Sequence, residues 1–320
     1  MRWITSLHRK TSLPSGRLDK KSRKMTTHSF FSFSNYSQLA ENLARTMSCV
    51  YSQVEIHRFP DQESCVRIHP VDVTPTCIVI NSLYHPDELS LPLIFLAETL
   101  REYGAQRIIL IAPYLAYMRQ DTRFREGEGI TAKYYSNLIS SYFDDLITVD
   151  PHLHRIHNLN EIYTIPTYTI HAAPLVAKWI HNNIERPLLI GPDSESEQWV
   201  KDLAELMRIP YLILEKTRHG DRDVEVSIPD IGRWSEHETI LYDDIISTGR
   251  TMIETIKHLN NAGMSPPACI GIHGIFAGTA YNDLISAGAK RIITSNSIPH
   301  QSNTLDLSSI IGSKLLEISN

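Results

Sequence analysis

Two adjacent acids and the polar loop after them carry the strongest chemical signal in this sequence. Residues 241–251 read LYDDIISTGRT, an apolar run that passes through both acids and a small loop into a helical pattern. Neighbouring carboxylates can accept hydrogen bonds from two sugar hydroxyls, and N–H groups at a helix N-terminus bind phosphate. The segment therefore predicts a ribose 5-phosphate site; the alternative is an Asp-Asp turn before a capped helix. The expected binding residues are Asp243, Asp244, Ser247, Thr248, Gly249 and Thr251.

Strands that alternate with helices must position this segment. The apolar patterns predict strands at 54–59, 65–68, 76–83, 106–112, 146–149, 187–190, 211–214, 239–246, 268–276 and 291–295. They predict helices at 88–103, 131–143, 173–183, 194–207, 251–261 and 281–286. Thr131 is expected to cap its helix, and Ser194 with Glu197 resembles a capping box.

This alternation predicts an α/β protein with mainly parallel sheets and right-handed crossovers. The pattern restarts near residue 165, which divides the chain into a basic extension at 1–28, an N-terminal domain at 29–165 and a C-terminal domain at 166–320. The last residues are expected to pack back on the N-terminal domain. Ligands of open α/β sheets bind at the carboxyl ends of strands, so the chemistry is expected there.

Composition excludes several classes of protein. Of the 320 residues, 42% are hydrophobic, but no apolar run approaches the roughly 18–20 residues needed to cross a membrane. The net charge is −5, yet residues 1–24 hold eight basic residues and one acid, which leaves 23 basic against 35 acidic residues elsewhere. An acidic body does not bind nucleic acid through a general positive field.

The four cysteines form no CxxC pair, which argues against a disulfide framework and favours a cytoplasmic protein. The basic extension lacks the apolar stretch of a secretory signal. It is expected to be a disordered tail or to precede a true start at Met25; a transit-type peptide is the alternative.

Six ordered segments resemble the ribose-phosphate diphosphokinase family, and the resemblance runs from about residue 31 to about 311. The loop at 241–251 alone also resembles the phosphoribosyl-diphosphate loop of type I phosphoribosyltransferases. The other segments favour the diphosphokinases, with archaeal-type members closest. They are FSFSNYSQLAENLA at 31–44, which resembles the family's opening strand and helix, RFPDQES at 58–64, APYLAYMRQDTRF at 112–124, TVDPH at 148–152, GPD at 191–193 and LEKTR at 214–218.

The resemblance implies two tandem domains of the type I phosphoribosyltransferase kind, which transfer pyrophosphate from ATP to the C1 hydroxyl of ribose 5-phosphate. It implies Mg²⁺ as cofactor and a homo-oligomer whose ATP site is shared across a subunit interface. The implied ATP-binding residues are Phe59, Asp61, Glu63, Arg119, Gln120 and His152. Arg119 supplies paired donors for phosphate oxygens; its alternative is a surface pair with Asp121.

Lys216 and Arg218 match the cations of the family's mobile catalytic loop, where they stabilise charge on the transferring group. His152 and Asp193 match metal-associated residues, although His152 suits phosphate better than Mg²⁺. Without the resemblance, each of these residues has an ordinary alternative. Lys216 and Arg218 are then solvent-exposed surface residues, His152 is a structural histidine and Asp193 is a helix cap.

Several positions depart from the family pattern. Ser247 stands where many members have Asp, Arg250 and Gln62 replace frequent glycines, and Thr122 replaces a common Lys. Residues 194–199 lack the usual Gly- and Ala-rich sequence. Two alternatives therefore stay open: a non-catalytic regulatory paralogue and a phosphoribosyltransferase.

Overall fold

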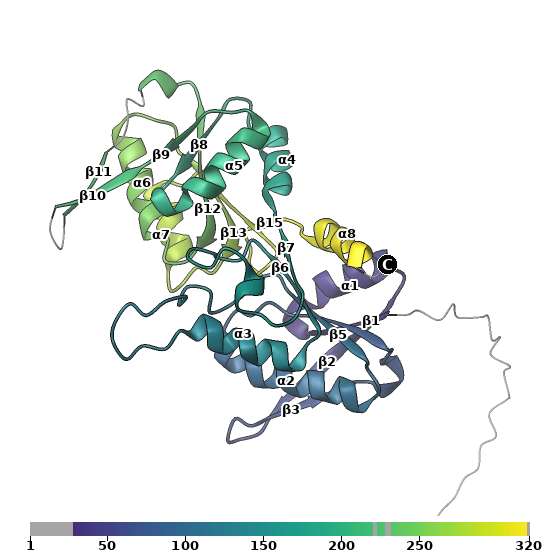
Figure 1. The fold of residues 1–320 in the computed structure, drawn as a ribbon. Coiled ribbons are helices and arrows are strands. Elements are labelled where there is room, and N and C mark those ends of the chain that lie inside the picture. The colour runs from purple at the N-terminus through teal and green to yellow at the C-terminus, as the bar shows by residue number, and fades with distance from the viewer. Residues whose placement is uncertain (1–27, 220–222, 228–231, 319–320) are drawn as a thin grey trace, which may run out of the picture.

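Buried apolar strands form the centre of two sheets, each covered by helices (Figure 1). The computed structural model describes residues 28–219, 223–227 and 232–318. The side chains at positions 195, 215–219, 223–227 and 232 lie outside this description. The expected basic extension falls almost entirely on residues 1–27, which also lie outside the described residues.

The strands are β1 His28–Phe33, β2 Val50–Arg58, β3 Ser64–Arg67, β4 Thr76–Ile80, β5 Arg107–Ala112, β6 Asp145–Val149, β7 Thr167–Ile170, β8 Pro187–Gly191, β9 Tyr211–Ile213, β10 Glu215–His219, β11 Asp223–Ser227, β12 Glu238–Ile246, β13 Ala268–Gly274, β14 Arg291–Ser295 and β15 Asn303–Leu305. The α-helices are α1 Ser37–Thr46, α2 Pro86–Glu102, α3 Thr131–Tyr142, α4 Ala173–Asn183, α5 Glu197–Met207, α6 Arg250–Asn261, α7 Ala280–Ala287 and α8 Ser308–Ile318. Short 3₁₀ helices are η1 Ser34–Tyr36, η2 Pro70–Asp72, η3 Leu159–Glu161, η4 Ser194–Ser196 and η5 Gly232–Trp234.

The first sheet has the order β3-β2-β1-β4-β5-β6-β7. All neighbours in it are parallel except β2 and β3, which form an antiparallel hairpin. Strand β7 begins two residues after position 165 and pairs with β6. The chain therefore crosses to the second sheet only after Ile170.

The second sheet has the order β15-β14-β13-β12-β8-β9 and is parallel throughout. From β8 the chain moves outward to β9, whereas from β12 it moves in the opposite direction to β13. This reversal opens a crevice at the carboxyl ends of β8 and β12, where open α/β sheets bind ligands. Strands β10 and β11 form a separate antiparallel hairpin that projects from this domain (Figure 1).

The two sheets share one apolar core. Ile147 and Val149 of β6 belong to the same buried cluster as Ile270 and Ile272 of β13. Buried His273 joins the domains, since its Nε2–H donates to the carbonyl oxygens of Val149 and Asp150, 3.0 and 3.2 Å away. Burial lowers the pKa of His273, in keeping with a neutral ring in this position.

The C-terminal helix returns to the N-terminal domain. Helix α8 lies beside α1 (Figure 1). Buried Ile311 and Leu315 of α8 join the cluster that contains Leu39 and Leu43 of α1. The end of the chain thereby packs against the first helix.

The predicted alternation of strands and helices is confirmed, but both expected helix caps are wrong. Thr131 is the first residue of α3 rather than its cap, and Ile130 precedes it without a side-chain bond. Asp193, not Ser194, caps the turn before α5: its Oδ1 accepts the Ser196 N–H at 3.2 Å. A carboxylate one position earlier competes successfully with the serine because it accepts more strongly.

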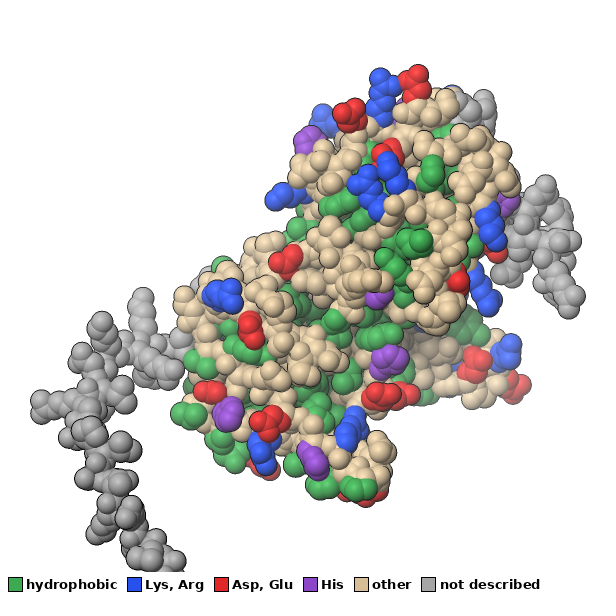
Figure 2. Space-filling model, turned by 180° about the vertical axis from the view of Figure 1, so that it is seen from behind, with side chains coloured by type: hydrophobic (Ala, Val, Ile, Leu, Met, Phe, Trp, Pro, Cys, Tyr) green, Lys and Arg blue, Asp and Glu red, His purple; other side chains and the backbone are tan. Residues whose placement is uncertain are grey.

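None of the helices among the described residues has the length and apolarity to span a bilayer. On the face shown in Figure 2, basic and acidic side chains are interspersed over the described surface.

His171 contributes a pH-dependent bond where the chain leaves the first sheet. The hydrogen bond between its Nδ1 and Asp150 Oδ1, 3.0 Å apart, raises the pKa of His171 against the opposing effect of burial. We expect His171→Asn to lower the free energy of unfolding most below about pH 6.5, the usual histidine value. The loss should shrink as pH rises through the raised pKa of His171 in the folded protein, because the native imidazole is then neutral.

Urea denaturation of both proteins between pH 5.5 and 8 measures this difference. His181→Asn, on the exposed end of α4, is the matched control. A loss of stability that is the same at every pH would contradict the role of His171.

Candidate functional site

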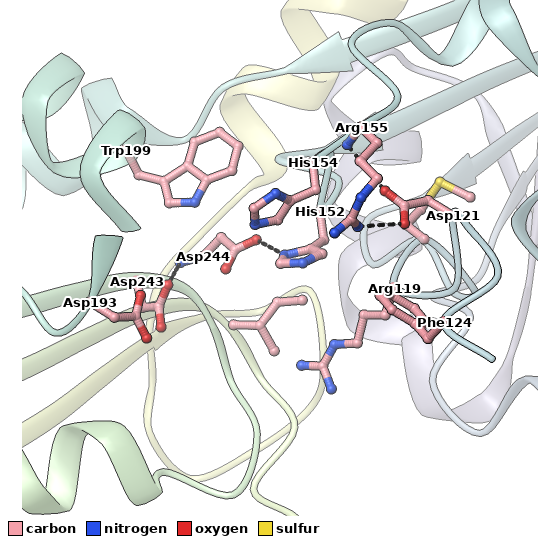
Figure 3. Close-up of a pocket in the computed structure, with 12 residues that line it drawn as sticks. Arg119, Asp121, Phe124, His152, His154, Arg155, Asp193, Trp199, Asp243 and Asp244 are labelled. Atoms are coloured by element: carbon pink, nitrogen blue, oxygen red, sulfur yellow. Dashed lines mark hydrogen bonds and ion pairs between the residues drawn. The ribbon is translucent and has the colours of Figure 1, made fainter. Parts of the chain in front are cut away.

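A cavity of about 330 Å³ lies between the two domains at the carboxyl ends of β8 and β12 (Figure 3). The reversal of strand order opens it on one side, and the connections that follow β5 and β6 close it on the other. Its walls are polar and carry both signs of charge. The lining residues are Met118, Arg119, Asp121, Phe124, His152, His154, Arg155, Asp193, Trp199, Asp243, Asp244 and Ile245.

The two acids predicted from the sequence stand on β12, one of the two central strands of the second sheet. Neighbouring residues of a strand point to opposite faces, so the two carboxylates meet different partners. Asp243 Oδ1 accepts the backbone N–H of Asp244 at 3.0 Å. Burial, and then the charges of Asp244 and Asp193, raise the pKa of Asp243 well above its usual value.

Asp244 is bonded across the domain boundary. His152, which follows β6, places Nδ1 2.7 Å from Asp244 Oδ2 (Figure 3). Burial disfavours the carboxylate of Asp244, but the bond from His152 and its charge hold the pKa of this group below its ordinary value. His152 and Asp244 were predicted for opposite halves of the site, and the fold brings them into direct contact.

The loop after the acids forms a small cup of about 110 Å³. The predicted residues Ser247, Thr248, Gly249 and Thr251 all line it, together with Arg250. Gly249 has φ +65°, and a Cβ there would stand 3.2 Å from Leu284 Cδ1, so the turn requires glycine. Helix α6 begins at Arg250 and directs its N-terminus into the cup, as anion binding requires.

Of the predicted ATP residues, Arg119 and His152 line the cavity. Arg119 Nη1 lies 3.3 Å from Ser247 Oγ, which links the connection after β5 to the cup of the other domain. The alternative pairing with Asp121 does not occur, because Asp121 binds Arg155 instead. Gln120 is not among the lining residues that the structure describes; its Nε2 donates to Thr122 O and Glu128 Oε2.

Phe59, Asp61 and Glu63 stand on the tip of the β2–β3 hairpin and do not line this cavity within the described chain. All three are exposed. Gln62, between the two acids, has φ +74°, a region that favours glycine. Arg250, the other residue that replaces a frequent glycine, is helical and is not strained in this way.

Lys216 and Arg218 both stand on β10, in register with Val226 and Val224 of β11. Their side chains lie outside the described residues. Their assignment to catalysis therefore stays a prediction, and the structure shows only the strand that carries them.

A divalent cation would have acidic neighbours at one end of the cavity. Asp193, two residues after the end of β8, lies close enough to Asp243 to raise the pKa of Asp243. No group of three or more His, Cys, Asp or Glu side chains in the described part of the chain is arranged to hold a metal by itself. Mg²⁺ commonly binds through one or two carboxylates plus substrate phosphates, so the residues present fit that mode.

The structure adds residues that the sequence did not single out. Arg155, Phe124 and Trp199 also line the cavity. Phe124 ends the RQDTRF segment and Arg155 follows the DPH segment by three positions, so proximity to these segments was the available signal. Trp199 lies on the first turn of α5, and no motif in the sequence around it indicated a binding residue.

Family profiles match both halves of the chain. One described as the N-terminal domain of ribose phosphate pyrophosphokinase covers residues 28–142. A phosphoribosyl transferase domain covers residues 158–309. The gap between the two matches, residues 143–157, falls before β7, so the second match begins while the chain still belongs to the first sheet.

Curated relatives match over nearly their whole length. A ribose-phosphate pyrophosphokinase from Sulfurisphaera tokodaii is 35% identical over 283 residues, 86% of this chain and 96% of the relative. One from Methanobrevibacter smithii is 30% identical over 87% of this chain and 96% of the relative. A crystal structure of phosphoribosylpyrophosphate synthetase from Mycobacterium smegmatis superposes with a TM-score of 0.80 at 22% identity, covering 92% of this chain and 99% of that one, which confirms the fold.

Gly249→Ala tests the cup. We expect it to lower the free energy of unfolding by about 1–2 kcal/mol, because a Cβ disfavours the left-handed backbone, and to weaken phosphate binding by distorting the turn. Urea denaturation and calorimetric titration with inorganic phosphate measure the two effects.

Gly263→Ala is the matched control, since Gly263 has φ +74° at the far end of α6 and nothing within 4 Å of its Cβ position. It should lose stability without losing phosphate affinity. Equal phosphate affinity in both variants would show that the cup does not bind the anion.

Proposed function

The chain belongs to the ribose-phosphate pyrophosphokinase family, and we propose that the cavity between its domains is the active site. The protein transfers pyrophosphate from ATP to the C1 hydroxyl of ribose 5-phosphate, giving 5-phosphoribosyl 1-diphosphate and AMP. The observation that carries the assignment is the placement of the acid pair and the phosphate cup at one wall, with Arg119 and His152 of the other domain facing them.

Ribose 5-phosphate would occupy the C-terminal wall. Its phosphate fits the cup, where N–H groups at the start of α6 and nearby hydroxyls donate. Asp243 and Asp244 would accept hydrogen bonds from the ring hydroxyls. The bond from His152 to Asp244 supports this role, because it keeps that carboxylate ionised in a buried position.

ATP would occupy the opposite wall, where Arg119 offers paired donors to phosphate oxygens. We assign Gln120 to the ATP-binding residues on the family resemblance alone. Phe59, Asp61 and Glu63 are exposed and do not line this cavity within the described part of one chain, which supports their supply to the ATP site of a second subunit. The proposal therefore includes a homo-oligomer.

His152 and Asp193 would hold Mg²⁺ together with the triphosphate. Bound Mg²⁺ supplies charge neutralisation at the phosphate oxygens. The acidic cluster around Asp243 supports this assignment, because a cation there relieves the repulsion that raises the pKa of Asp243. A cytoplasmic location also belongs to the proposal, and the four unpaired cysteines support it.

In the reaction, the C1 oxygen attacks the β-phosphorus as the bond to the α-phosphate oxygen breaks, and AMP leaves with that oxygen. The C1 hydroxyl loses its proton, which passes to solvent, as the new bond forms. Negative charge grows on the transferring group, where cations stabilise the transition state more than the ground state. We propose that Lys216 and Arg218 act there once the hairpin closes over the cavity, which also excludes water.

AMP formation tests the function. We expect AMP only when ATP, Mg²⁺ and ribose 5-phosphate are supplied together, and chelation with EDTA should abolish turnover reversibly. Chromatographic separation of AMP from ATP measures it. Silence over a range of phosphate and metal concentrations would count against the proposal, and turnover that required a nucleobase would indicate a phosphoribosyltransferase.

Lys216→Ala tests the hairpin. By analogy with the loss of one donor to a developing anion, the rate should fall at least about 100-fold. Lys257→Ala, on the exposed side of α6, is the control and should retain full activity. A fall of less than about threefold would remove Lys216 from the chemistry.

A further inference from the structure

Arg155 is a second arginine in the cavity, and none of the recognised segments contains it. It lies in the connection after β6, three residues beyond His152. Its side chain is 55% exposed, although its partner Asp121 is almost completely buried. The guanidinium thus reaches from a buried anchor into the open cavity.

Asp121 holds Arg155 at two points. Asp121 Oδ2 accepts the backbone N–H of Arg155 at 3.1 Å, and Oδ1 accepts from Nη1 at 3.0 Å. One carboxylate therefore fixes both the start and the tip of the side chain. A guanidinium carries five N–H donors, and these two bonds use only one of them.

Phe124 supports the guanidinium from another side. Arg155 Cζ lies 5.4 Å from the centre of the Phe124 ring, within the range of a cation–π contact. Asp121 and Phe124 both belong to the connection after β5 that also carries Arg119. One loop therefore positions both arginines of the cavity.

The direction of Arg155 indicates its ligand. In Figure 3 its guanidinium points toward His152, while Arg119 reaches into the cavity from below. The acids Asp193, Asp243 and Asp244 lie at the opposite end (Figure 3). The cavity thus carries both described arginines at one end, Arg155 being paired there with Asp121, and three acids at the other. The end with the arginines suits a ligand with several negative oxygens.

We propose that Arg155 binds the triphosphate of ATP beside Arg119, as a further substrate-binding residue held in place by Asp121. This inference rests on the proposed function. Its fork of donors bridges two phosphate oxygens, which a lysine ammonium cannot reproduce as a planar pair. Asp121 acts as a positioning residue, because both of its carboxylate oxygens are bonded to Arg155.

Steady-state kinetics of Arg155→Gln test the proposal. We expect the KM for ATP to rise about 10- to 100-fold, the effect of losing charge-assisted hydrogen bonds, while the KM for ribose 5-phosphate stays within about twofold. Arg155→Lys should recover part of the loss, and Asp121→Asn should raise the KM for ATP to a smaller extent. The control is Arg123→Gln, since Arg123 is bonded to Glu128 O and does not line the cavity among the described residues.

Inorganic tripolyphosphate identifies the part of ATP that Arg155 contacts. Its competition against ATP should weaken in Arg155→Gln by the same factor as ATP binding. An unchanged inhibition constant, or an equal rise in both KM values together with a lower melting temperature, would overturn the proposal in favour of a structural ion pair.

The proposed function and the role of Arg155 can be refuted independently of each other. Calorimetric titration of ATP into wild-type protein and Arg155→Gln needs no turnover. If AMP formation were absent, the proposed function would fail, yet a lower ATP affinity in the variant would still support Arg155. Equal ATP affinity would refute Arg155 whatever the activity.

Discussion

The repulsion between two carboxylates at the end of one buried strand governs the arrangement of the site. Asp243 and Asp244 cannot both remain ionised there without nearby positive charge or strong donors. The structure treats them differently: His152 holds the charge of Asp244, whereas Asp243 faces Asp193 and has a raised pKa. The protein itself supplies the partner that stabilises the charge of Asp244, whereas the charge of Asp243 depends on the ligand or cation that binds beside it.

The bond between His152 and Asp244 requires the two domains to be in close contact. His152 follows β6 of the first sheet, and Asp244 stands on β12 of the second. Their contact depends on the shared core and on His273, which fixes β13 against the end of β6. A site of this kind cannot form on either half alone, since each half supplies one member of the bond.

The sequence predicted most strands of the two sheets and the local site because both depend on short-range patterns, but no pattern marked β7, β10, β11 or β15. Strand β12, the turn at Gly249 and the start of α6 all follow from residues 238–261, and each lies where the pattern placed it. The capping errors at Thr131 and Ser194 are also local: Asp193 displaced Ser194 as the cap, whereas α3 begins at Thr131 itself without a side-chain cap. Gln62 shows how a glycine position can be filled without glycine, at a cost in backbone strain.

Contacts between distant segments were not predictable in this way. Nothing in the spacing of Asp121 and Arg155, 34 positions apart, shows that one carboxylate binds both ends of the arginine. The bond between His152 and Asp244 joins residues 92 positions apart. Such pairs follow from the packing of whole domains, because the crossing of the chain after β7 decides which loops face one another.

The return of α8 to α1 ties the first and last described helices into one cluster. The C-terminal half, if produced alone, would expose the apolar stripe of α8, and the N-terminal half would lack the cover over α1. Two chains that met while partly folded would be able to exchange this helix, each completing the other's core. Separate expression of the halves would therefore favour precipitation over two independent folding units.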